Sequence, residues 1–284
     1  MRWRDLRRSS NVRDVRGRGT GLRMPLPLGR GGGIGLVVLL IIAAIFGGPE
    51  LVYQLLGGGG PDTGQPSSTP AGVQDEDRQF TAAILGSTED VWGRIFESAG
   101  AEYLPPELTL FNGAVSSACG YASAAVGPFY CPADARVYLD TSFFDDLARL
   151  GGPGDFAQAY VIGHEIGHHV QNLVGTADEV RAAQARAGDA SAANSLQVAM
   201  ELQADCYAGV WAWHANQRYQ VLEPGDVEEG LAAAAAIGDD RLLQNAGRRV
   251  TPDSFTHGSS AQRQEWLSRG LESGDPAACN AFGG

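Results

Sequence analysis

The chain has 284 residues, 44% of them hydrophobic, which suffices for one substantial domain with appendages or for two small domains. The formal net charge of -12 hides an asymmetry, because residues 1–30 hold nine arginines and two aspartates (+7) while the rest carry 12 basic and 31 acidic groups (-19). A body this acidic would repel phosphates, which argues against a nucleic acid partner.

The composition of the first 74 residues indicates three segments outside the globular body. Residues 1–30 are expected to form a basic, disordered, cytoplasmic segment. Residues 31–48 (GGGIGLVVLLIIAAIFGG) are uncharged and mostly aliphatic, at the short end for a membrane-spanning helix. A cleaved signal peptide is the alternative, but no small-x-small cleavage site follows. Residues 49–74, rich in Gly, Pro and Ser, are typical of a linker.

The arginines before the apolar stretch predict its orientation. By the positive-inside rule they place the N-terminus in the cytoplasm and everything after the stretch outside it. We therefore expect a single-pass protein of the cell membrane, attached through this N-terminal anchor, with an extracytoplasmic globular domain.

Residues 75–284 are expected to form that domain, with an α+β, mainly helical fold and a small β-sheet. Apolar spacing predicts a helix over 75–99, interrupted at Gly86. Short β-prone runs bounded by Pro, Gly and Asp predict strands at Leu108–Phe111 and Arg136–Leu139. Further helices are predicted at 155–173, 177–187, 192–218, 226–246 and 258–272.

Four cysteines occur, none of them in a CxxC pair, so zinc-ribbon and thioredoxin-like motifs have no support. Outside the cytosol an even number of cysteines suggests up to two disulfides. Cys119 with Cys131 would close a short loop and leave Cys206 with Cys279, but three pairings are possible and the sequence does not choose among them.

The motif that carries chemistry is HExxH, present as His164-Glu165-Ile166-Gly167-His168. Residues four apart share one face of a helix, so both imidazoles can reach the same ion. Glu165 is placed to act on a metal-activated water rather than to bind the metal. A buried helix also tolerates such polar groups only when they are paired or bound to a ligand. The pattern predicts one Zn²⁺ site.

A third ligand distinguishes the classes of HExxH enzyme. The metzincin pattern needs a glycine and a histidine where this chain has Gln171 and Val174. His169 is a poor ligand because it points about 100° away from His168 around the helix. Downstream, Glu201 and Asp205 lie four apart on a strongly helical segment.

HExxH followed by ExxxD resembles the gluzincin arrangement, of which thermolysin is the familiar member. The resemblance implies that Glu201 is the third zinc ligand. It also implies that Asp205 orients a ligating histidine through the second ring nitrogen.

Longer blocks resemble a bacterial family of predicted neutral zinc metallopeptidases with an N-terminal membrane segment. The resemblance covers roughly residues 75–282 and implies a zincin-like catalytic domain that acts on a peptide or protein. The blocks are CGYASAAVGPFYCPAD, VYLDTSFF, GDFAQAYVIGHEIGHHVQ, ELQADCYAGVWA and FTHGSSAQRQEWLSRGLESGD.

Two supporting elements remain hypotheses at this level. Val137–Leu139 is the candidate edge strand for holding a substrate backbone, with a core strand as the alternative. His257 is the candidate donor to the oxyanion of the transition state, although it could equally be an ordinary residue at a helix start. Tyr207, Tyr160 and Arg263 are weaker candidates.

The sequence thus favours a zinc peptidase with Glu165 as general base and acid. The alternative is a zinc-containing envelope binding or assembly protein on a catalytically idle peptidase fold. The presence of Glu165 argues against that alternative, because a purely structural site needs no general base.

Overall fold

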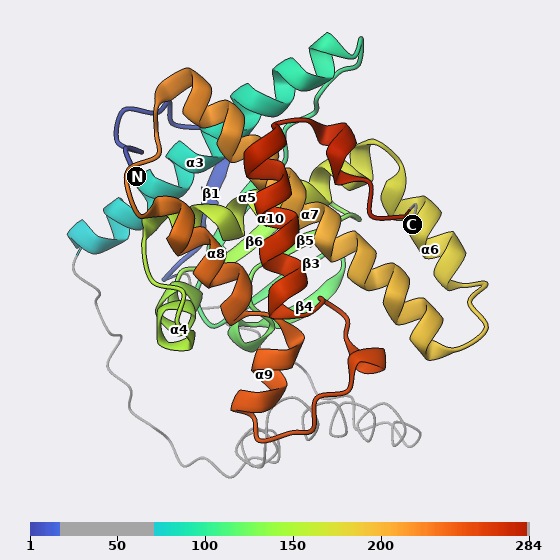
Figure 1. The fold of residues 1–284 in the computed structure, drawn as a ribbon. Coiled ribbons are helices and arrows are strands. Elements are labelled where there is room, and N and C mark those ends of the chain that lie inside the picture. The colour runs from blue at the N-terminus through green and yellow to red at the C-terminus, as the bar shows by residue number, and fades with distance from the viewer. Residues whose placement is uncertain (18–70, 283–284) are drawn as a thin grey trace, which may run out of the picture. The chain divides into compact units, whose positions relative to one another are not determined.

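The computed structural model describes residues 1–17 and 71–282 (Figure 1), and of these residues 1–17 and 74–282 belong to one compact unit. In chain order the described elements are β1 (Val12–Asp14), α3 (Ala71–Ser98), β2 (Glu107–Phe111), β3 (Ala114–Ser117), β4 (Gly120–Ser123), β5 (Phe129–Cys131), β6 (Arg136–Asp140), α4 (Ser142–Leu150), α5 (Asp155–Leu173), α6 (Thr176–Gln184), α7 (Ala190–Tyr219), α8 (Asp226–Ala236), α9 (Asp239–Asn245) and α10 (Ser260–Ser273), with short 3₁₀ turns at Ala124–Val126, Pro252–Ser254 and Pro276–Cys279.

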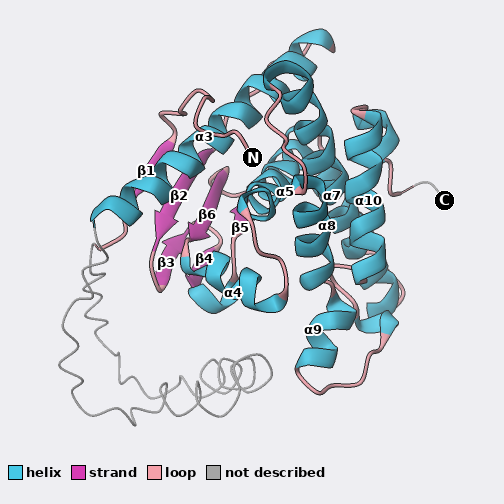
Figure 2. Ribbon diagram, turned by 60° about the vertical axis from the view of Figure 1, so that its left-hand side comes forward, coloured by secondary structure: helices cyan, strands magenta, loops and turns pink. Residues whose placement is uncertain are grey.

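A four-stranded sheet with the order β1-β2-β6-β5 lies beside the helices (Figure 2). The first three strands of this order are parallel, and β5 runs antiparallel to β6. The strands β3 and β4 form a separate hairpin. Val137–Leu139 lies in β6, between β2 and β5, so the edge-strand hypothesis is wrong and the alternative of a core strand is confirmed. The strand at that edge of the sheet is β5.

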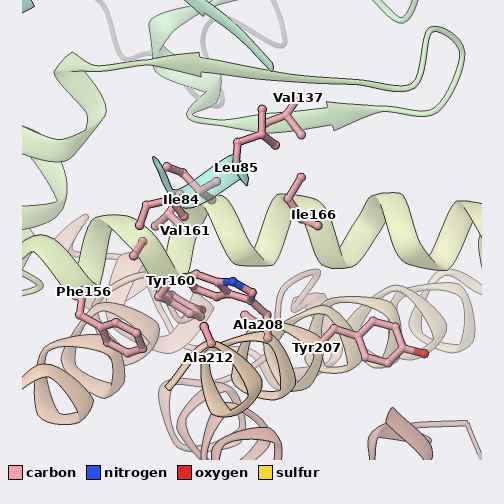
Figure 3. Close-up of a cluster of buried hydrophobic side chains, with 14 of the residues drawn as sticks. Ile84, Leu85, Val137, Phe156, Tyr160, Val161, Ile166, Tyr207, Ala208 and Ala212 are labelled. Carbon is pink, nitrogen blue, oxygen red and sulfur yellow. The ribbon is translucent and has the colours of Figure 1, made fainter. Parts of the chain in front are cut away.

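The helix α5 is the centre of the core, with 14 of its 19 residues buried. Figure 3 shows Val161 and Ile166 on the side of α5 that faces Val137 of β6 and the buried residues of α3, while Tyr160 faces Ala208 of α7. A helix that is apolar on all sides is buried on all sides. Polar groups on α5 therefore need partners from the elements around it.

The strand and helix predictions are confirmed in outline. Both predicted strands are present and the five later helices begin and end within a few residues of their predicted ends, except that 226–246 is divided into α8 and α9. The helix predicted at 75–99 is wrong in one respect: α3 begins at Ala71 and runs through Gly86 without a break. The chain also forms two disulfides, Cys119–Cys131 and Cys206–Cys279.

The first 17 residues are not a disordered tail but part of the folded unit. Trp3 is 6% exposed and packs edge-on against Phe80 of α3, with ring centroids 5.4 Å apart. The Ser9 backbone N–H donates to the Ala82 carbonyl at 2.8 Å, and β1 extends the sheet next to β2. The prediction of disorder over 1–30 is therefore corrected for residues 1–17. Their apolar side chains and main-chain donors find partners on the domain.

The membrane part of the fold prediction is also corrected. The predicted anchor, residues 31–48, lies outside the described residues, as does most of the predicted linker, residues 49–74. Within the ranges that the structure describes, no helix is both long and apolar enough to cross a bilayer. Residues 1–17 and the domain also pack together as one unit, so they lie on the same side of any membrane. The predicted single-pass arrangement placed them on opposite sides.

Candidate metal centre

The three predicted metal ligands converge in the structure. His164 and His168 come from α5 and Glu201 comes from α7. The two Nε2 atoms are 3.1 Å apart, and the Glu201 Oε2 atom lies 3.2 Å from His164 Nε2 and 3.5 Å from His168 Nε2. All three donor atoms lie within 4.8 Å of one another. One ion could bind all three.

Close packing of two helices brings Glu201 to the histidines. Gly167 of α5 faces Ala204 of α7, and a Cβ atom at position 167 would lie 2.9 Å from the Ala204 carbonyl oxygen and 3.0 Å from its Cα. Any larger residue would push α7 away from α5. The glycine inside HEIGH thus has a structural reason, which is the close approach of the helix that carries the third ligand.

Asp205 holds the far side of the His164 ring. His164 Nδ1 donates to Asp205 Oδ1 at 2.8 Å, and the hydroxyl of Tyr160 donates to the same oxygen at 2.6 Å. Arg263 donates from Nε to Oδ2 and from Nη2 to Oδ1, both at 2.9 Å. Burial raises the pKa of Asp205, but the charges of Arg263 and His164 outweigh this effect and lower it to about 2. The carboxylate is therefore ionised, and both of its oxygens accept hydrogen bonds.

A different residue holds the second histidine. His168 Nδ1 donates to Gln171 Oε1 at 2.9 Å. Both rings therefore carry a proton on Nδ1, and each Nε2 can offer a lone pair to the space that it shares with Glu201. Two ring nitrogens and a carboxylate oxygen this close together need positive charge among them, which either protons on the rings or a bound cation can supply. Two imidazoles and one carboxylate are a typical ligand set of catalytic zinc, so the residues fit this ion.

The electrostatics of the site favour positive charge between the rings. Burial lowers the pKa of His164, but Asp205 and Glu201 outweigh burial and raise it to about 10. The pKa of His168 is raised for the same reason, because the effect of Glu201 exceeds that of burial. Burial raises the pKa of Glu201, yet the two histidines hold it well below its usual range. A divalent cation supplies the charge that these buried groups require.

The three ligands lie on the wall of a cavity of about 680 Å³. Glu165 lies on the same wall and is 7% exposed. His257 also reaches the cavity, but its side chain is 52% exposed and its Nδ1 contacts Asp239 Oδ1 at 3.2 Å. The structure therefore brings the ligands and Glu165 to one cavity and places His257 on the wall of that cavity, with its polar contact to Asp239 rather than to the ligands.

Three residues have contacts that motif reasoning did not assign. Tyr160 and Arg263 are alternative candidates for an oxyanion donor by sequence, but their polar atoms bind Asp205. The sequence uses Gln171 only to exclude the metzincin class, yet this residue binds His168. Its position, three residues after His168 on one helix face, is the signal that could have revealed it. Tyr207 is buried and does not line this cavity.

Comparison with known proteins identifies the relatives of the chain. A family model described as "Putative neutral zinc metallopeptidase" matches residues 1–282. The chain is 50% identical over 299 residues to the uncharacterized protein YpfJ of Escherichia coli, an alignment that covers 100% of this chain and 99% of YpfJ. It is 46% identical over 211 residues to the uncharacterized protein Rv2575 of Mycobacterium tuberculosis, covering 70% of this chain and 69% of Rv2575. No solved structure matches the chain.

Proposed function

The chain belongs to the neutral zinc metallopeptidase family, and we propose that it hydrolyses peptide bonds with one zinc ion bound by His164, His168 and Glu201. The observation that carries this proposal is the convergence of the two Nε2 lone pairs and the Glu201 carboxylate beside Glu165 in one cavity. A purely structural zinc site is closed by a fourth protein ligand. No fourth His, Cys, Asp or Glu joins this group within the described residues, so a position stays open for water or substrate.

Each residue of the site has a defined task in this proposal. When bound, zinc supplies Lewis acidity, which makes water nucleophilic at neutral pH and polarises the substrate carbonyl. Glu165 accepts the proton of the attacking water and delivers it to the amine of the leaving peptide. Asp205 and Gln171 keep the histidine rings in the orientation and tautomer that metal binding needs.

The surroundings of the cavity support a peptide as the substrate. Its volume of about 680 Å³ lies in the usual range for sites that enclose a ligand. Phe129 and Tyr130 of the edge strand β5 line it, and among the described residues β5 pairs with β6 alone. An extended peptide can add to such an edge through main-chain hydrogen bonds. We assign this role to β5 in place of the strand at 137–139.

The cavity wall also offers a donor for the transition state. His257 remains the proposed donor to the oxyanion, because it lines the cavity and an imidazole can donate a hydrogen bond. The loop that carries it is held by Asp239, which accepts from the backbone N–H groups of Thr256 and His257, both at 2.7 Å.

The two disulfides favour a compartment that oxidises thiols.

The decisive experiment compares the purified full chain with Glu165→Gln. We expect about one zinc per chain in both proteins, and a loss of peptide-library cleavage of at least about 100-fold in the variant, because the general base is removed. Glu97→Gln is the matched control, since it makes the same chemical change at an exposed position on α3 and should leave cleavage unchanged.

Two results would contradict the proposal. A wild-type chain that binds no zinc would remove the metal site. A chain that binds zinc but cleaves no peptide, or cleaves equally well after Glu165→Gln, would favour the idle binding protein.

A further inference from the structure

The two histidine ligands are supported unequally. His164 meets the charged Asp205, whereas His168 meets the neutral amide of Gln171 at 2.9 Å. The His168 side chain is also more exposed, 17% against 9% for His164. A neutral amide can hold a ring only if its own orientation is fixed, because the oxygen and nitrogen ends of the group are nearly the same shape. The contacts that fix Gln171 therefore matter for the metal.

Gln171 is completely buried and all its polar atoms are used. Its Nε2 donates to the Met200 carbonyl at 2.7 Å and to Gln203 Oε1 at 2.9 Å, both from α7. A reversed amide would place its NH₂ group against the Nδ1–H of His168 and its oxygen against two acceptors. The two acceptors from α7 thus compel Gln171 to present its oxygen to His168.

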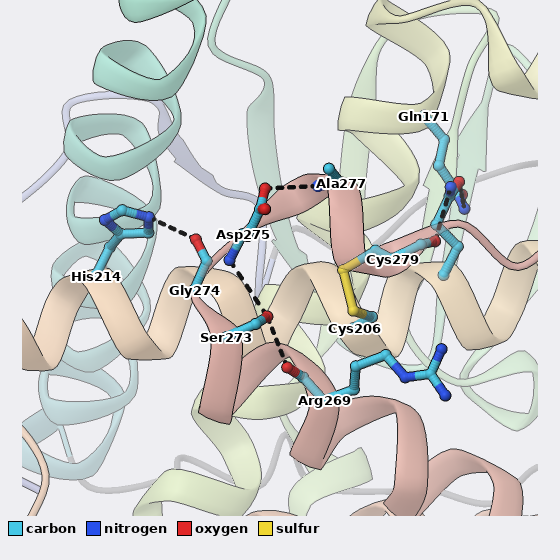
Figure 4. Close-up of a disulfide and its surroundings, with 10 residues drawn as sticks. Gln171, Cys206, His214, Arg269, Ser273, Gly274, Asp275, Ala277 and Cys279 are labelled. Atoms are coloured by element: carbon cyan, nitrogen blue, oxygen red, sulfur yellow. Dashed lines mark hydrogen bonds between the residues drawn. A yellow bond between two sulfur atoms is a disulfide. The ribbon is translucent and has the colours of Figure 1, made fainter.

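The orientation of Gln203 is fixed in turn by a hydrogen bond to a residue outside α7. Its Nε2 donates to the Cys279 carbonyl at 3.1 Å, which leaves its oxygen free to accept from Gln171. Cys279 is completely buried at the end of the 3₁₀ turn Pro276–Cys279 and is bonded to Cys206 (Figure 4). This disulfide joins residues 73 apart in sequence and holds the C-terminal turn against α7.

We propose that Gln171 and Gln203 are positioning residues for the metal, and that the disulfide-held turn Pro276–Cys279 is the outer end of this relay. The relay runs from the Cys279 carbonyl through Gln203 and Gln171 to His168. Zinc affinity therefore depends on the Cys206–Cys279 bond, although neither cysteine binds the metal. The inference rests on the zinc site of the proposed function.

The test measures the zinc dissociation constant of the full chain by competition with a chromophoric chelator. Gln203→Leu keeps the side-chain size and removes both hydrogen bonds, and the double change Cys206→Ala with Cys279→Ala removes the disulfide without leaving a thiol. We expect each to weaken zinc binding by about 10- to 100-fold, the usual effect of losing support behind a metal ligand.

A matched control separates this effect from general loosening of the C-terminal region. His214 of α7 also anchors that region, because its Nε2 bonds to the Gly274 carbonyl at 2.9 Å, but it has no link to His168 (Figure 4). His214→Ala should lower the melting temperature of the metal-free protein and leave the zinc dissociation constant within about twofold of the wild type.

Combining the changes gives a further readout that a merely structural role would not produce. In a serial relay, Gln203→Leu added to the double cysteine change should weaken zinc binding no further than the larger of the two effects. Losses that multiply, or a Gln203→Leu variant with wild-type affinity, would overturn the relay. If the cysteine variant does not fold, the affinity of Gln203→Leu decides alone. A wild-type chain without zinc would instead overturn the proposed function.

Discussion

The imidazole ring of His164 lies between two of the charged groups at the metal centre, Glu201 and Asp205. Glu201 and Asp205 lie on successive turns of α7, and they contact the two nitrogens of the His164 ring, at 3.2 and 2.8 Å. Arg263 then neutralises Asp205 from behind, with its side chain only 3% exposed. Buried ion pairs often cost more in desolvation than they return in stability. The network is therefore better explained by the orientation of His164 than by a contribution to folding.

Asp239 offers a pH-dependent test of the loop that carries His257. Burial raises the pKa of Asp239, but hydrogen bonds from His257 and Thr256 outweigh this and lower it below the ordinary 3.8. A carboxylate with a depressed pKa stabilises the folded state above the unfolded pKa, and this contribution is lost as the pH falls through the folded pKa. The free energy of unfolding of the wild type should therefore exceed that of Asp239→Ala by a constant amount at pH 6 and pH 5, and this difference should narrow as the pH falls below 3.8.

Urea denaturation at a series of pH values checks this expectation. Asn194→Ala is the control, because Asn194 Nδ2 donates to the Asp253 carbonyl of the same loop at 3.0 Å and an amide does not titrate. The difference in free energy of unfolding between Asn194→Ala and the wild type should stay constant with pH. If the free energy of unfolding of Asp239→Ala also differs from that of the wild type by the same amount at every pH, the ionised carboxylate does not hold the loop.

Sequence reasoning could find the metal ligands because they follow short, local rules. The spacing of His164 and His168 and the ExxxD resemblance of Glu201 are visible in the chain itself. The same resemblance includes Asp205, but the other supports are harder to find, since Gln203 and Arg263 become partners only when α7 and α10 pack around α5. No local pattern contains that information.

At the scale of elements, Gly86 shows how the N-terminal segment fits on α3. A Cβ atom at position 86 would lie 2.5 Å from the Arg7 carbonyl oxygen. Gly86→Ala should therefore lower the free energy of unfolding by about 1–3 kcal/mol, because the backbone of residues 7–9 would have to move. Gly93→Ala on the same helix meets nothing within 4 Å and should raise the stability by about 0.5–1 kcal/mol, as expected from helix propensity.

Thermal and urea denaturation of the two variants provides the measurement. Equal stabilisation of both would mean that the segment does not rest on α3 at Gly86. The contrast also explains the sequence prediction of an interrupted helix. A glycine signals either a break or a close approach, and only the docked N-terminal segment tells which applies.

The order of the strands was beyond the sequence for a related reason. The two strands β2 and β6 are five residues long and could be predicted from their β-prone residues, but β1 and β5 are three residues each. So short a run has no periodicity to detect. Without β5, the strand at 137–139 was the natural candidate for the edge. Pairing between distant segments decides which strand borders the cavity.

At the scale of the whole molecule, the packing of residues 1–17 constrains topology. Arg7 donates to Glu89 at 2.7 Å and to Asp90 at 2.8 Å on α3, while Trp3 is buried against the same helix. The positive charge of the N-terminal segment therefore has a structural role, because the segment bonds to acidic residues of the domain. The asymmetry of charge along the sequence is therefore no guide to which side of a membrane this segment occupies.

Cysteine labelling in intact cells tests this arrangement directly. Ser10 and Ser98 are both exposed, one in the N-terminal segment and one at the end of α3, and the four native cysteines of the described chain are paired in disulfides. A membrane-impermeant thiol reagent should therefore label Ser10→Cys and Ser98→Cys alike, either both or neither, because the two positions belong to one folded unit. Labelling after lysis and denaturation confirms that both thiols are reactive. If intact cells gave a label at one position and not at the other, residues 1–17 could not be packed on the domain, and the positive-inside prediction would regain its basis.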